Sequence, residues 1–258
     1  MATPEPPFRL AAMSWPAVDA ALEETATMLL PVGSTEQHGH HLPLGVDVLM
    51  PEAVAERVAR RTECLLAPTI DYGVSPHHQF KPGTFTVETE TFQRYVRDVC
   101  RSANDWGVEN VVLLNGHYLA QDAELEIVVR RLRTEHGMTA FHAPLSDLWA
   151  GAAADERTGA AAFHAAEFET SVMLALRPDL VEMDAAVPVD VPDDALPLTD
   201  YDAYGENRVG WALSAADMAE LTPAGNLGDP SGATAAMGER MVDAAVSNLT
   251  ALVEALDA

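Results

Sequence analysis

The chain has 258 residues, of which 48% are hydrophobic and 6% aromatic, enough for one large α/β domain or two small ones. Its 40 acidic residues outnumber 15 basic ones, of which only Lys81 is a lysine, and the formal net charge is −25. Such a surface repels nucleic acid phosphates and anionic membranes, and no segment approaches the ~20 apolar residues that span a bilayer. We therefore expect neither nucleic acid nor membrane as a partner.

The acidic residues are spread along the chain rather than gathered in a tail, which argues against an acidic interaction arm. We expect a cytoplasmic protein of a salt-loving organism, because molar salt shortens the Debye length to ~3 Å and relieves self-repulsion. Residues 1–10 lack the basic-then-apolar layout of a signal peptide. Cys64 and Cys100 lie far apart without metal-ligand spacing, so free thiols in a reducing compartment are expected.

Apolar runs and turn residues predict alternating helices and strands. Ser14 is a candidate N-cap for a first helix ending at residue 22, and Ser231 for a long C-terminal helix ending at residue 256. The predicted strands are residues 26–32, 64–67, 110–114 and 138–143, and the other predicted helices are residues 51–59, 89–106, 120–136 and 165–176. Residues 69–87 show no periodicity, and long irregular loops of this kind often line sites.

Strands that alternate with helices are typical of a parallel sheet with right-handed crossovers and helices on both faces. We therefore predict an α/β fold in which a mainly parallel sheet lies between two helical layers, a three-layer α/β/α arrangement. Small residues at 151–162 predict a linker, and a segment rich in Pro and Asp at 185–202 predicts a surface excursion. Without an internal repeat or a change of composition, residues 1–258 are interpreted as a single domain.

A polar loop, residues 31–47, directly follows the first predicted strand. Glu36 and His38 are two positions apart, so both side chains leave the same face of an extended segment, and Asp47 follows after a turn. An imidazole and two carboxylates are ligand types of divalent transition metals. The alternative is a flexible polar loop with solvated histidines, and two further groups of residues favour the metal site.

The first of these groups, residues 115–118, follows the third predicted strand and contains His117. Ligands of parallel sheets bind outside the carboxyl ends of the strands, so His117 is expected at the same rim as the first loop. The second group is His164, just before a predicted helix, and Glu169 within that helix. An apolar run follows Glu169, which predicts partial burial and hence a need for a cation or hydrogen-bond donor. Glu167 competes with Glu169, and we expect only Glu169 to point inward.

Other chemistries lack their motifs. The chain has no nucleophile elbow, Gly-rich phosphate loop or HExxH helix, and Ser34 lacks the setting of a catalytic serine. His77 and His78 lie in the long irregular loop, where exposed histidines are more common than substrate contacts. The remaining histidines are interpreted as structural or as outer groups of the site: His40, His41, His136 and His142.

Taken together, these motifs resemble the creatininase family of metal-dependent amidohydrolases. The resembling segments are Glu36-Gln37-His38-Gly39-His40-His41 with Asp47, Asn115-Gly116-His117, His164 to Ser171, and Gly228-Asp229-Pro230 with Ala233-Thr234. Residues 80–84 look like the Phe-Pro-Gly-Thr loop of the family with Lys81 inserted. The matches follow the family order from about Val32 to Gly238, most of the chain, and are together highly specific.

The resemblance implies a three-layer α/β/α domain that assembles into homo-oligomers, usually hexamers, and a site for two divalent metal ions per chain. Mixed histidine and carboxylate ligands suit Zn²⁺, Mn²⁺ or Fe²⁺. One ion would take Glu36 and His117, the other His38 and Glu169, and Asp47 would bridge the pair.

His164 matches the catalytic histidine of the family, and Tyr118 and His78 are candidate contacts for a small-molecule substrate. The implied reaction is cleavage of a non-peptide C–N bond, in an amide, cyclic amide or formamide, by a metal-bridging hydroxide. Three carboxylates and one hydroxide would balance the charge of two divalent ions. His164 would stabilise the oxyanion or pass a proton to the leaving nitrogen.

Departures from the family pattern concern the substrate. Leu119 stands where creatininase has a glutamate, and Ala160 and Ala161 stand where it has a Trp-Asp pair. These changes argue against creatinine itself, because a carboxylate that could pair with a guanidino-like group is lost. The alternatives are a formamidopyrimidine ribonucleotide deformylase of archaeal riboflavin and deazaflavin synthesis, and a catalytically idle metal-binding scaffold.

Overall fold

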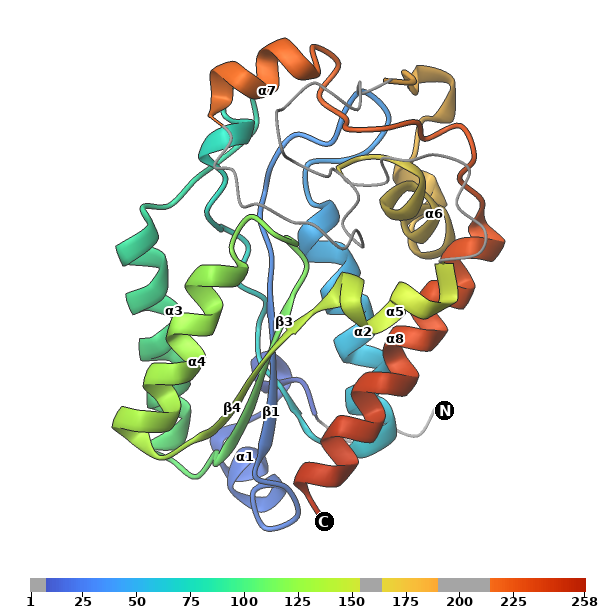
Figure 1. Ribbon diagram of the computed structural model, residues 1–258. Coiled ribbons are helices and arrows are strands. Elements are labelled where there is room, and N and C mark those ends of the chain that lie inside the picture. Colours follow the sequence, from blue (N-terminus) through green and yellow to red (C-terminus); the bar gives the residue numbers. More distant parts are fainter. Residues whose placement is uncertain (1–7, 154–163, 190–213) are drawn as a thin grey trace.

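Four parallel strands form the centre of the protein, in the sheet order β2-β1-β3-β4 (Figure 1). The computed structural model describes residues 8–153, 164–189 and 214–258. The strands are β1 (Thr27–Val32), β2 (Leu65–Leu66), β3 (Asn110–Asn115) and β4 (Thr139–Pro144). All three pairings are parallel, and each strand lies within a residue or two of the predicted range.

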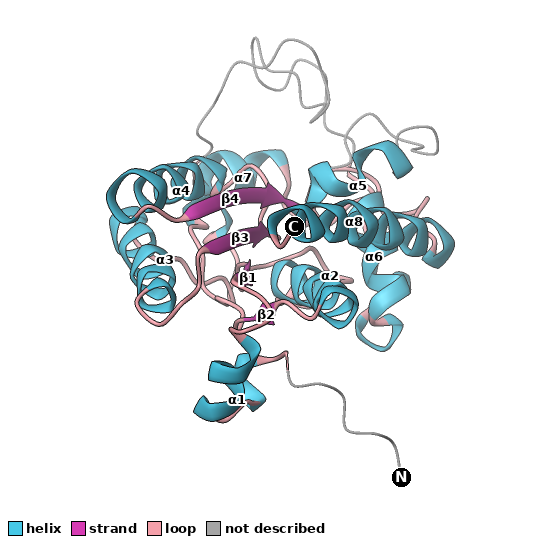
Figure 2. Cartoon of the chain, turned by 90° about the horizontal axis from the view of Figure 1, so that it is seen from below, coloured by secondary structure: helices cyan, strands magenta, loops and turns pink. Residues whose placement is uncertain are grey.

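Helices cover both faces of the sheet. The helices are α1 (Trp15–Ala21), α2 (Val46–Thr62), α3 (Thr89–Asn104), α4 (Asp122–His136), α5 (Leu145–Ala153), α6 (Glu167–Leu176), α7 (Ala215–Leu221) and α8 (Ala235–Leu256). Seen from below, α3 and α4 lie on one face, and α2 and α8 on the other (Figure 2). The predicted three-layer α/β/α fold is confirmed. Within the described ranges, no helix is long and apolar enough to cross a membrane.

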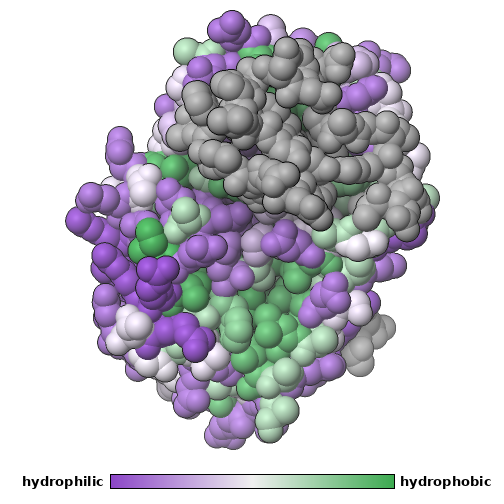
Figure 3. Space-filling view, viewed as in Figure 1, coloured by the Kyte–Doolittle hydropathy of each residue, from purple (hydrophilic) through white to green (hydrophobic). Residues whose placement is uncertain are grey.

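The central strands separate two hydrophobic cores. Leu29 of β1 and Val112 of β3 pack into the core beneath α2, α6 and α8, whereas Leu30 and Val111 pack into the core beneath α3 and α4. All four residues have zero exposure, which explains why both strands are continuous apolar runs rather than alternating ones. On the face seen in Figure 3, hydrophobic surface gathers in the lower middle, between more hydrophilic flanks.

The strand order places a switch point between β1 and β3, where the chain leaves β1 toward one side of the sheet and later returns to the other. Val32 and Asn115, the last residues of these strands, are paired, so both loops emerge at one height. A Cβ on Gly33 would lie 2.4 Å from the backbone oxygen of Asp47, and one on Gly116 would lie 2.1 Å from it. Two glycines therefore allow the first turn of α2 to sit directly over the ends of β1 and β3.

Helix α2 begins at Val46, five residues before the predicted start at Pro51, so Asp47 lies on a helix rather than in a loop. Proline usually marks the first turn of a helix, and this preference misplaced the start. Pro51 has no N–H to donate to the carbonyl of Asp47, four residues earlier. That carbonyl instead faces the two glycines at the strand ends.

Other differences concern helix boundaries. Helix α5 occupies the start of the predicted linker, α7 was not predicted, and α8 begins after Thr234 rather than after Ser231. Residues 154–162 of the predicted linker and 190–202 of the predicted excursion lie outside the described residues. Cys64 and Cys100 are free, as expected, and both are buried.

Candidate metal centre

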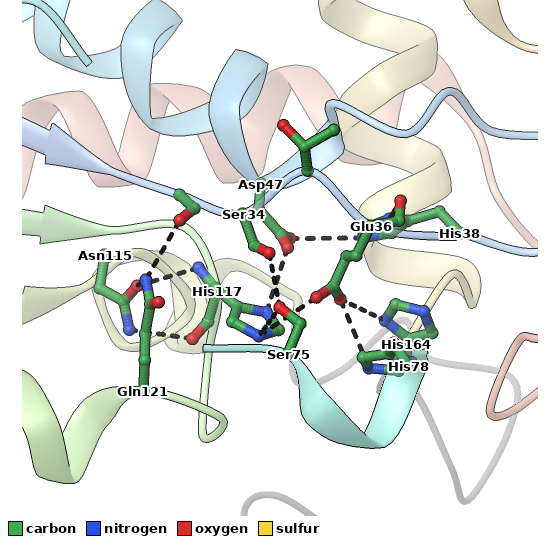
Figure 4. A network of polar contacts seen from close by, with 12 residues as sticks. Ser34, Glu36, His38, Asp47, Ser75, His78, Asn115, His117, Gln121 and His164 are labelled. Carbon is green, nitrogen blue, oxygen red and sulfur yellow. Dashed lines mark hydrogen bonds and ion pairs between the residues drawn. The ribbon is translucent and has the colours of Figure 1, made fainter. Parts of the chain in front are cut away.

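Three side chains from the ends of β1 and β3 and the start of α2 meet above the switch point (Figure 4). Glu36 lies in the loop after β1, Asp47 in the first turn of α2, and His117 in the turn after β3. The distance from His117 Nε2 to Glu36 Oε2 is 3.2 Å, and that from His117 Nδ1 to Asp47 Oδ2 is 3.1 Å. All three residues are at most 4% exposed.

Two further side chains extend this group on the other side of Asp47. His38 Nε2 lies 3.3 Å from Asp47 Oδ1 and 3.7 Å from Glu169 Oε2. Glu169 comes from the first turn of α6 and accepts a 2.6 Å hydrogen bond from the backbone N–H of Ala165. Asp47 thus presents one oxygen to each imidazole and lies between the two halves of the cluster.

Two histidines close the cluster beside Glu36. His164 Nδ1 lies 3.6 Å and His78 Nε2 lies 3.4 Å from the same atom, Glu36 Oε1. The two rings are stacked with centroids 3.9 Å apart, and the ring of His164 also lies 4.4 Å from that of His38. His78 is 3% exposed, so the expectation of a surface histidine is wrong.

The turn that carries His117 is held by a network of side-chain amides and carboxylates. Asn115 accepts a hydrogen bond from the His117 N–H and donates one to the His117 carbonyl, both 3.0 Å long. Gln121 donates to Asn115 Oδ1 over 2.8 Å, and Asp122 accepts from Asn115 Nδ2 over 2.7 Å. His142 lies 3.1 Å from Asp122 Oδ1, in keeping with its predicted structural role.

A second pair of groups supports the ring of His117. Ser75 Oγ lies 3.1 Å from His117 Nε2 and 2.6 Å from Ser34 Oγ. The backbone N–H of Ser75 donates to Thr86 Oγ1, which fixes the irregular segment against the site. Ser34 is therefore a buried partner of Ser75, and it does not stand on a strained elbow.

Several buried atoms at the centre lie within ion-pair distance of neighbouring side chains of the site but form no hydrogen bond: both oxygens of Glu36, Nε2 of His38 and Oδ2 of Asp47. Buried polar atoms are normally paired, because an unpaired one keeps the full cost of its desolvation. Two of the groups with metal-ligand spacing are Glu36, Asp47 and His117, and His38, His164 and Glu169. The unpaired atoms are nitrogen and oxygen donors of the types that divalent cations take, so the residues present fit a metal site.

The three carboxyl groups of the site have shifted pKa values. Burial raises the pKa of Glu36, with His117 opposing and Asp47 adding to the rise, and burial raises the pKa of Glu169 to about 7. Burial acts in the same direction on Asp47, but His38 and His117 outweigh it and hold its pKa below the usual value. Charged Asp47 therefore disfavours the charged forms of Glu36 and Glu169, a repulsion that a bound cation would offset.

The imidazoles divide into two types. Burial disfavours the protonated form of His38 and His117, but the adjacent carboxylates outweigh it and raise their pKa values to about 10 and about 9. Burial lowers the pKa of His164 and of His78 well below the ordinary value, and nearby histidines add to the effect. His164 and His78 are therefore neutral at pH 7.

The remaining predicted residues lie around this centre. Tyr118 is half-buried in the turn that follows His117, and His40 is exposed. His41 is buried and lies 2.9 Å from Thr170 Oγ1, linking the first loop to α6. Glu167 is buried and Glu169 is partly buried, so the expectation that only one of them could point inward is wrong, although it is Glu169 that faces His38.

Two contributors were not singled out by the sequence reasoning: Ser75 and Gln37. Ser75 lies in a segment without periodicity, and no motif marks it. Gln37 stands between two predicted ligands, and its amide contacts both His78 and His164. Its position inside a motif of metal-ligand residues was the signal that could have identified it.

Comparisons with known proteins find similar sequences and a similar fold. The family model described as Creatininase: Creatinine amidohydrolase matches residues 11–253. The creatinine amidohydrolase of Pseudomonas putida is 34% identical over 194 residues, which cover 69% of this chain and 73% of that protein. A mycofactocin precursor peptide peptidase of Mycobacterium ulcerans is 35% identical over 236 residues, covering 86% and 84%. A crystal structure of creatininase superposes with a TM-score of 0.79 at 27% identity, covering 96% of this chain and 97% of the other.

Proposed function

The chain belongs to the creatininase family, and on this premise we propose that it is a binuclear metal-dependent amidohydrolase that cleaves a non-peptide C–N bond. It is a hydrolase of carbon–nitrogen bonds, as its relatives are. The observation that carries the binuclear assignment is the position of Asp47, whose two oxygens face His38 and His117 separately.

In the proposed site, Glu36 and His117 would hold one ion, His38 and Glu169 would hold the other, and Asp47 would contribute to both. The unpaired buried atoms of Glu36, His38 and Asp47 support this assignment. When bound, two divalent ions supply a water of lowered pKa and polarise the scissile carbonyl. Relatives include structures named as a manganese form of creatininase and a zinc–zinc form of a mutant, and we propose zinc, manganese or iron here.

His164 is the proposed acid–base group. Its Nδ1 lies 3.6 Å from Glu36 Oε1, so it faces the centre of the cluster, while its Nε2 lies 2.7 Å from the backbone oxygen of Gln37. Neutral His164 takes a proton on Nδ1 from the attacking water and returns it to the leaving nitrogen. His78 and Tyr118 are the proposed substrate contacts beside it.

The proposed substrate is a small amide, cyclic amide or formamide. One relative is named for creatinine and another for a precursor peptide, and a mutant creatininase is described as complexed with creatine. Leu119 is exposed at the rim beside His117, where creatininase has a glutamate. An apolar side chain offers no acceptor for the N–H groups of a guanidino-like substrate, and this favours a formamide, such as a formamidopyrimidine ribonucleotide, over creatinine.

The family resemblance and the charge extend the proposal to the whole molecule. We propose a cytoplasmic homo-oligomer, a hexamer by resemblance, from a salt-loving organism, with residues 1–258 as one domain. Light scattering in molar KCl measures the oligomer directly. A monomer under those conditions contradicts the assembly without affecting the site.

The test of the site combines metal analysis with hydrolysis. Protein purified in molar KCl and loaded with zinc is expected to hold two ions per chain, and Glu169→Gln to lose one of them. Asp47→Asn is expected to lose both ions and more than ~10²-fold of activity, since outer partners alone typically cost 10–100-fold. Asp19→Asn, at an exposed position of α1, is the matched control.

Substrates for this assay are creatinine, a formamidopyrimidine ribonucleotide and short peptides. Hydrolysis of the formamide supports the proposed substrate class. A loaded protein that turns over none of them is the idle scaffold, and an Asp47→Asn variant that keeps two ions contradicts the ligand assignment.

A further inference from the structure

The amide of Gln37 lies between two histidines of the site and is 4% exposed. Its Oε1 accepts a 3.1 Å hydrogen bond from the backbone N–H of Gly39, and its Nε2 donates over 2.8 Å to the backbone oxygen of Gly225. A backbone N–H can only donate and a backbone oxygen can only accept. The orientation of the amide is therefore determined by its neighbours, and one Nε2 hydrogen remains for a further acceptor.

The same neighbourhood determines which nitrogen of His164 carries the proton. His164 Nε2 lies 2.7 Å from the backbone oxygen of Gln37, which can only accept, so Nε2 is the protonated nitrogen. In neutral imidazole the other nitrogen is then a free acceptor. That nitrogen, Nδ1, lies 3.6 Å from Glu36 Oε1 and is directed toward the metal-ligand cluster.

The second hydrogen of Gln37 Nε2 has two candidate acceptors, His78 Nδ1 and His164 Nε2, each 2.9 Å away. His164 Nε2 is already a donor, so the hydrogen is donated to His78 Nδ1. His78 is therefore protonated on Nε2, the atom that lies 3.4 Å from Glu36 Oε1.

We propose that Gln37 is a positioning residue that sets the tautomers of both histidines, so that His164 offers a proton-accepting Nδ1 and His78 a proton-donating Nε2–H. This inference rests on the proposed function, in which His164 moves a proton between water and the leaving nitrogen. With the opposite tautomer, His164 would present an N–H to the centre and could not accept a proton there. The network therefore prepares His164 as a base before substrate binds.

A second feature shows that the place of this amide is built into the fold. Gly225 has a φ of +98°, and a Cβ there would lie 2.1 Å from Gln37 Oε1. The backbone N–H of Gln37 donates to Thr84 Oγ1, and that of Gly225 donates to Thr222 Oγ1. Segments from three distant parts of the chain thus enclose one side chain.

Nitrogen NMR of protein labelled with ¹⁵N-histidine tests the proposal, because protonated and unprotonated imidazole nitrogens differ widely in chemical shift. In wild-type protein, His164 and His78 are both expected as the Nε2–H tautomer, with and without zinc. In Gln37→Glu a carboxylate oxygen replaces the donor, so His78 is expected to change to the Nδ1–H tautomer. We expect kcat to fall ~10–100-fold with zinc content unchanged, the effect of losing an outer partner.

Gln79→Glu is the matched control, because it makes the same substitution at an exposed position beside His78. It is expected to leave both tautomers and kcat unchanged. Gln37→Met removes the donor without adding charge and replaces Gln37→Glu if that variant does not fold. An Nδ1–H tautomer of His164 in wild-type protein, or unchanged tautomers in both Gln37 variants, would overturn the proposal.

Failure of the proposed function gives a different result. A zinc content below one ion per chain, or no hydrolysis of any substrate, contradicts the function while the zinc-free spectra still report the tautomers. The tautomers seen in the spectra therefore test the role of Gln37 independently of the proposed function.

Discussion

His38 and His117 compete for protons with any cation that binds beside Asp47. Their pKa values of about 10 and about 9 mean that both are protonated at pH 7.5 in metal-free protein, whereas a metal ligand must be an unprotonated nitrogen. Binding of two zinc ions at pH 7.5 is therefore expected to release at least two protons per chain, one from each imidazole, with a further contribution from Glu36 and Glu169, whose pKa values are raised. Because protons and zinc compete, the zinc affinity is expected to fall as the pH is lowered.

Calorimetry in two buffers of different ionisation enthalpy measures this release. Exposed His40 lies next to the site in sequence, and His40→Asn is expected to leave the proton count unchanged. Zinc binding without proton release would show that the carboxylates do not hold protonated imidazoles in the metal-free protein.

The proximity of His117 to Glu36 and Asp47 could be predicted because parallel strands bring their carboxyl ends to one rim. The burial of His78 could not be predicted, since its segment has no periodicity and packs through Gln37 and Glu36, which are distant in sequence. The roles of the individual ligands remain predictions. Sequence patterns do not indicate the direction in which a side chain points within an irregular loop.

At the scale of the elements, helix α8 begins directly after its N-cap residue, Thr234. Thr234 Oγ1 accepts a 3.1 Å hydrogen bond from the N–H of Met237, three residues on, whereas the backbone of Ser231 bonds to Asp229. Loss of an N-cap side chain typically costs ~1 kcal/mol. Thr234→Ala is therefore expected to lower the free energy of unfolding by about 1 kcal/mol, and Ser231→Ala by less than about 0.5 kcal/mol, as for other surface changes.

Denaturant titration of the two variants decides between the predicted cap and the observed one. A larger loss of unfolding free energy for Ser231→Ala than for Thr234→Ala would support the predicted start of α8 after Ser231.

Close packing of α6 against α8 makes Gly238 a sensitive position. A Cβ on Gly238 would lie 1.9 Å from the backbone oxygen of Ser171, and a backbone atom cannot move aside as a side chain does. Gly238→Ala is expected to cost ~1–3 kcal/mol, the range for overpacking. Gly151 is the matched control, because it lies in α5 and a Cβ added there would have no neighbouring atom within 4 Å.

Gly151→Ala is expected to be neutral or stabilising by ~0.5–1 kcal/mol, since glycine weakens a helix interior. The same denaturant titration measures both variants. Equal effects of the two substitutions would contradict a backbone contact between α6 and α8.

Strand positions and the α3 and α4 helices could be predicted because continuous apolar runs and helical spacing report burial directly. Helix starts could not, because they depend on tertiary contacts that local signals do not contain. Pro51 and Ser231 are both residues typical of a helix start, yet α2 begins earlier and α8 later. In each case a long-range contact determines where the helix begins. The carbonyl of Asp47 lies against Gly33, and the N–H of Thr234 donates to Ser171 Oγ.

At the scale of the whole molecule, the net charge of −25 opposes compaction. Favourable surface pairs exist, such as Arg101 with Asp105 and Arg177 with Asp179, but exposed pairs contribute only ~0–1 kcal/mol each. Because 40 acidic residues face only 15 basic ones, most carboxylates cannot pair one to one with a basic side chain. Salt screens attraction and repulsion alike, and because repulsion between carboxylates outweighs attraction here, screening is expected to stabilise the fold.

The melting temperature is therefore expected to rise between 0.05 and 2 M KCl, by ~4 °C or more, which corresponds to about 1–2 kcal/mol for a chain of this size. Calorimetric scans at fixed protein and zinc concentration measure it, because bound zinc would shift the midpoint by itself. A variant with Asp19→Asn, Glu23→Gln and Glu24→Gln removes three exposed charges near α1 without disturbing the site. If screening is the cause, this variant is more stable than wild type at low salt and the two converge at high salt. An equal rise in both proteins would instead assign the effect to salt acting on apolar surface, because that contribution does not depend on carboxylate number.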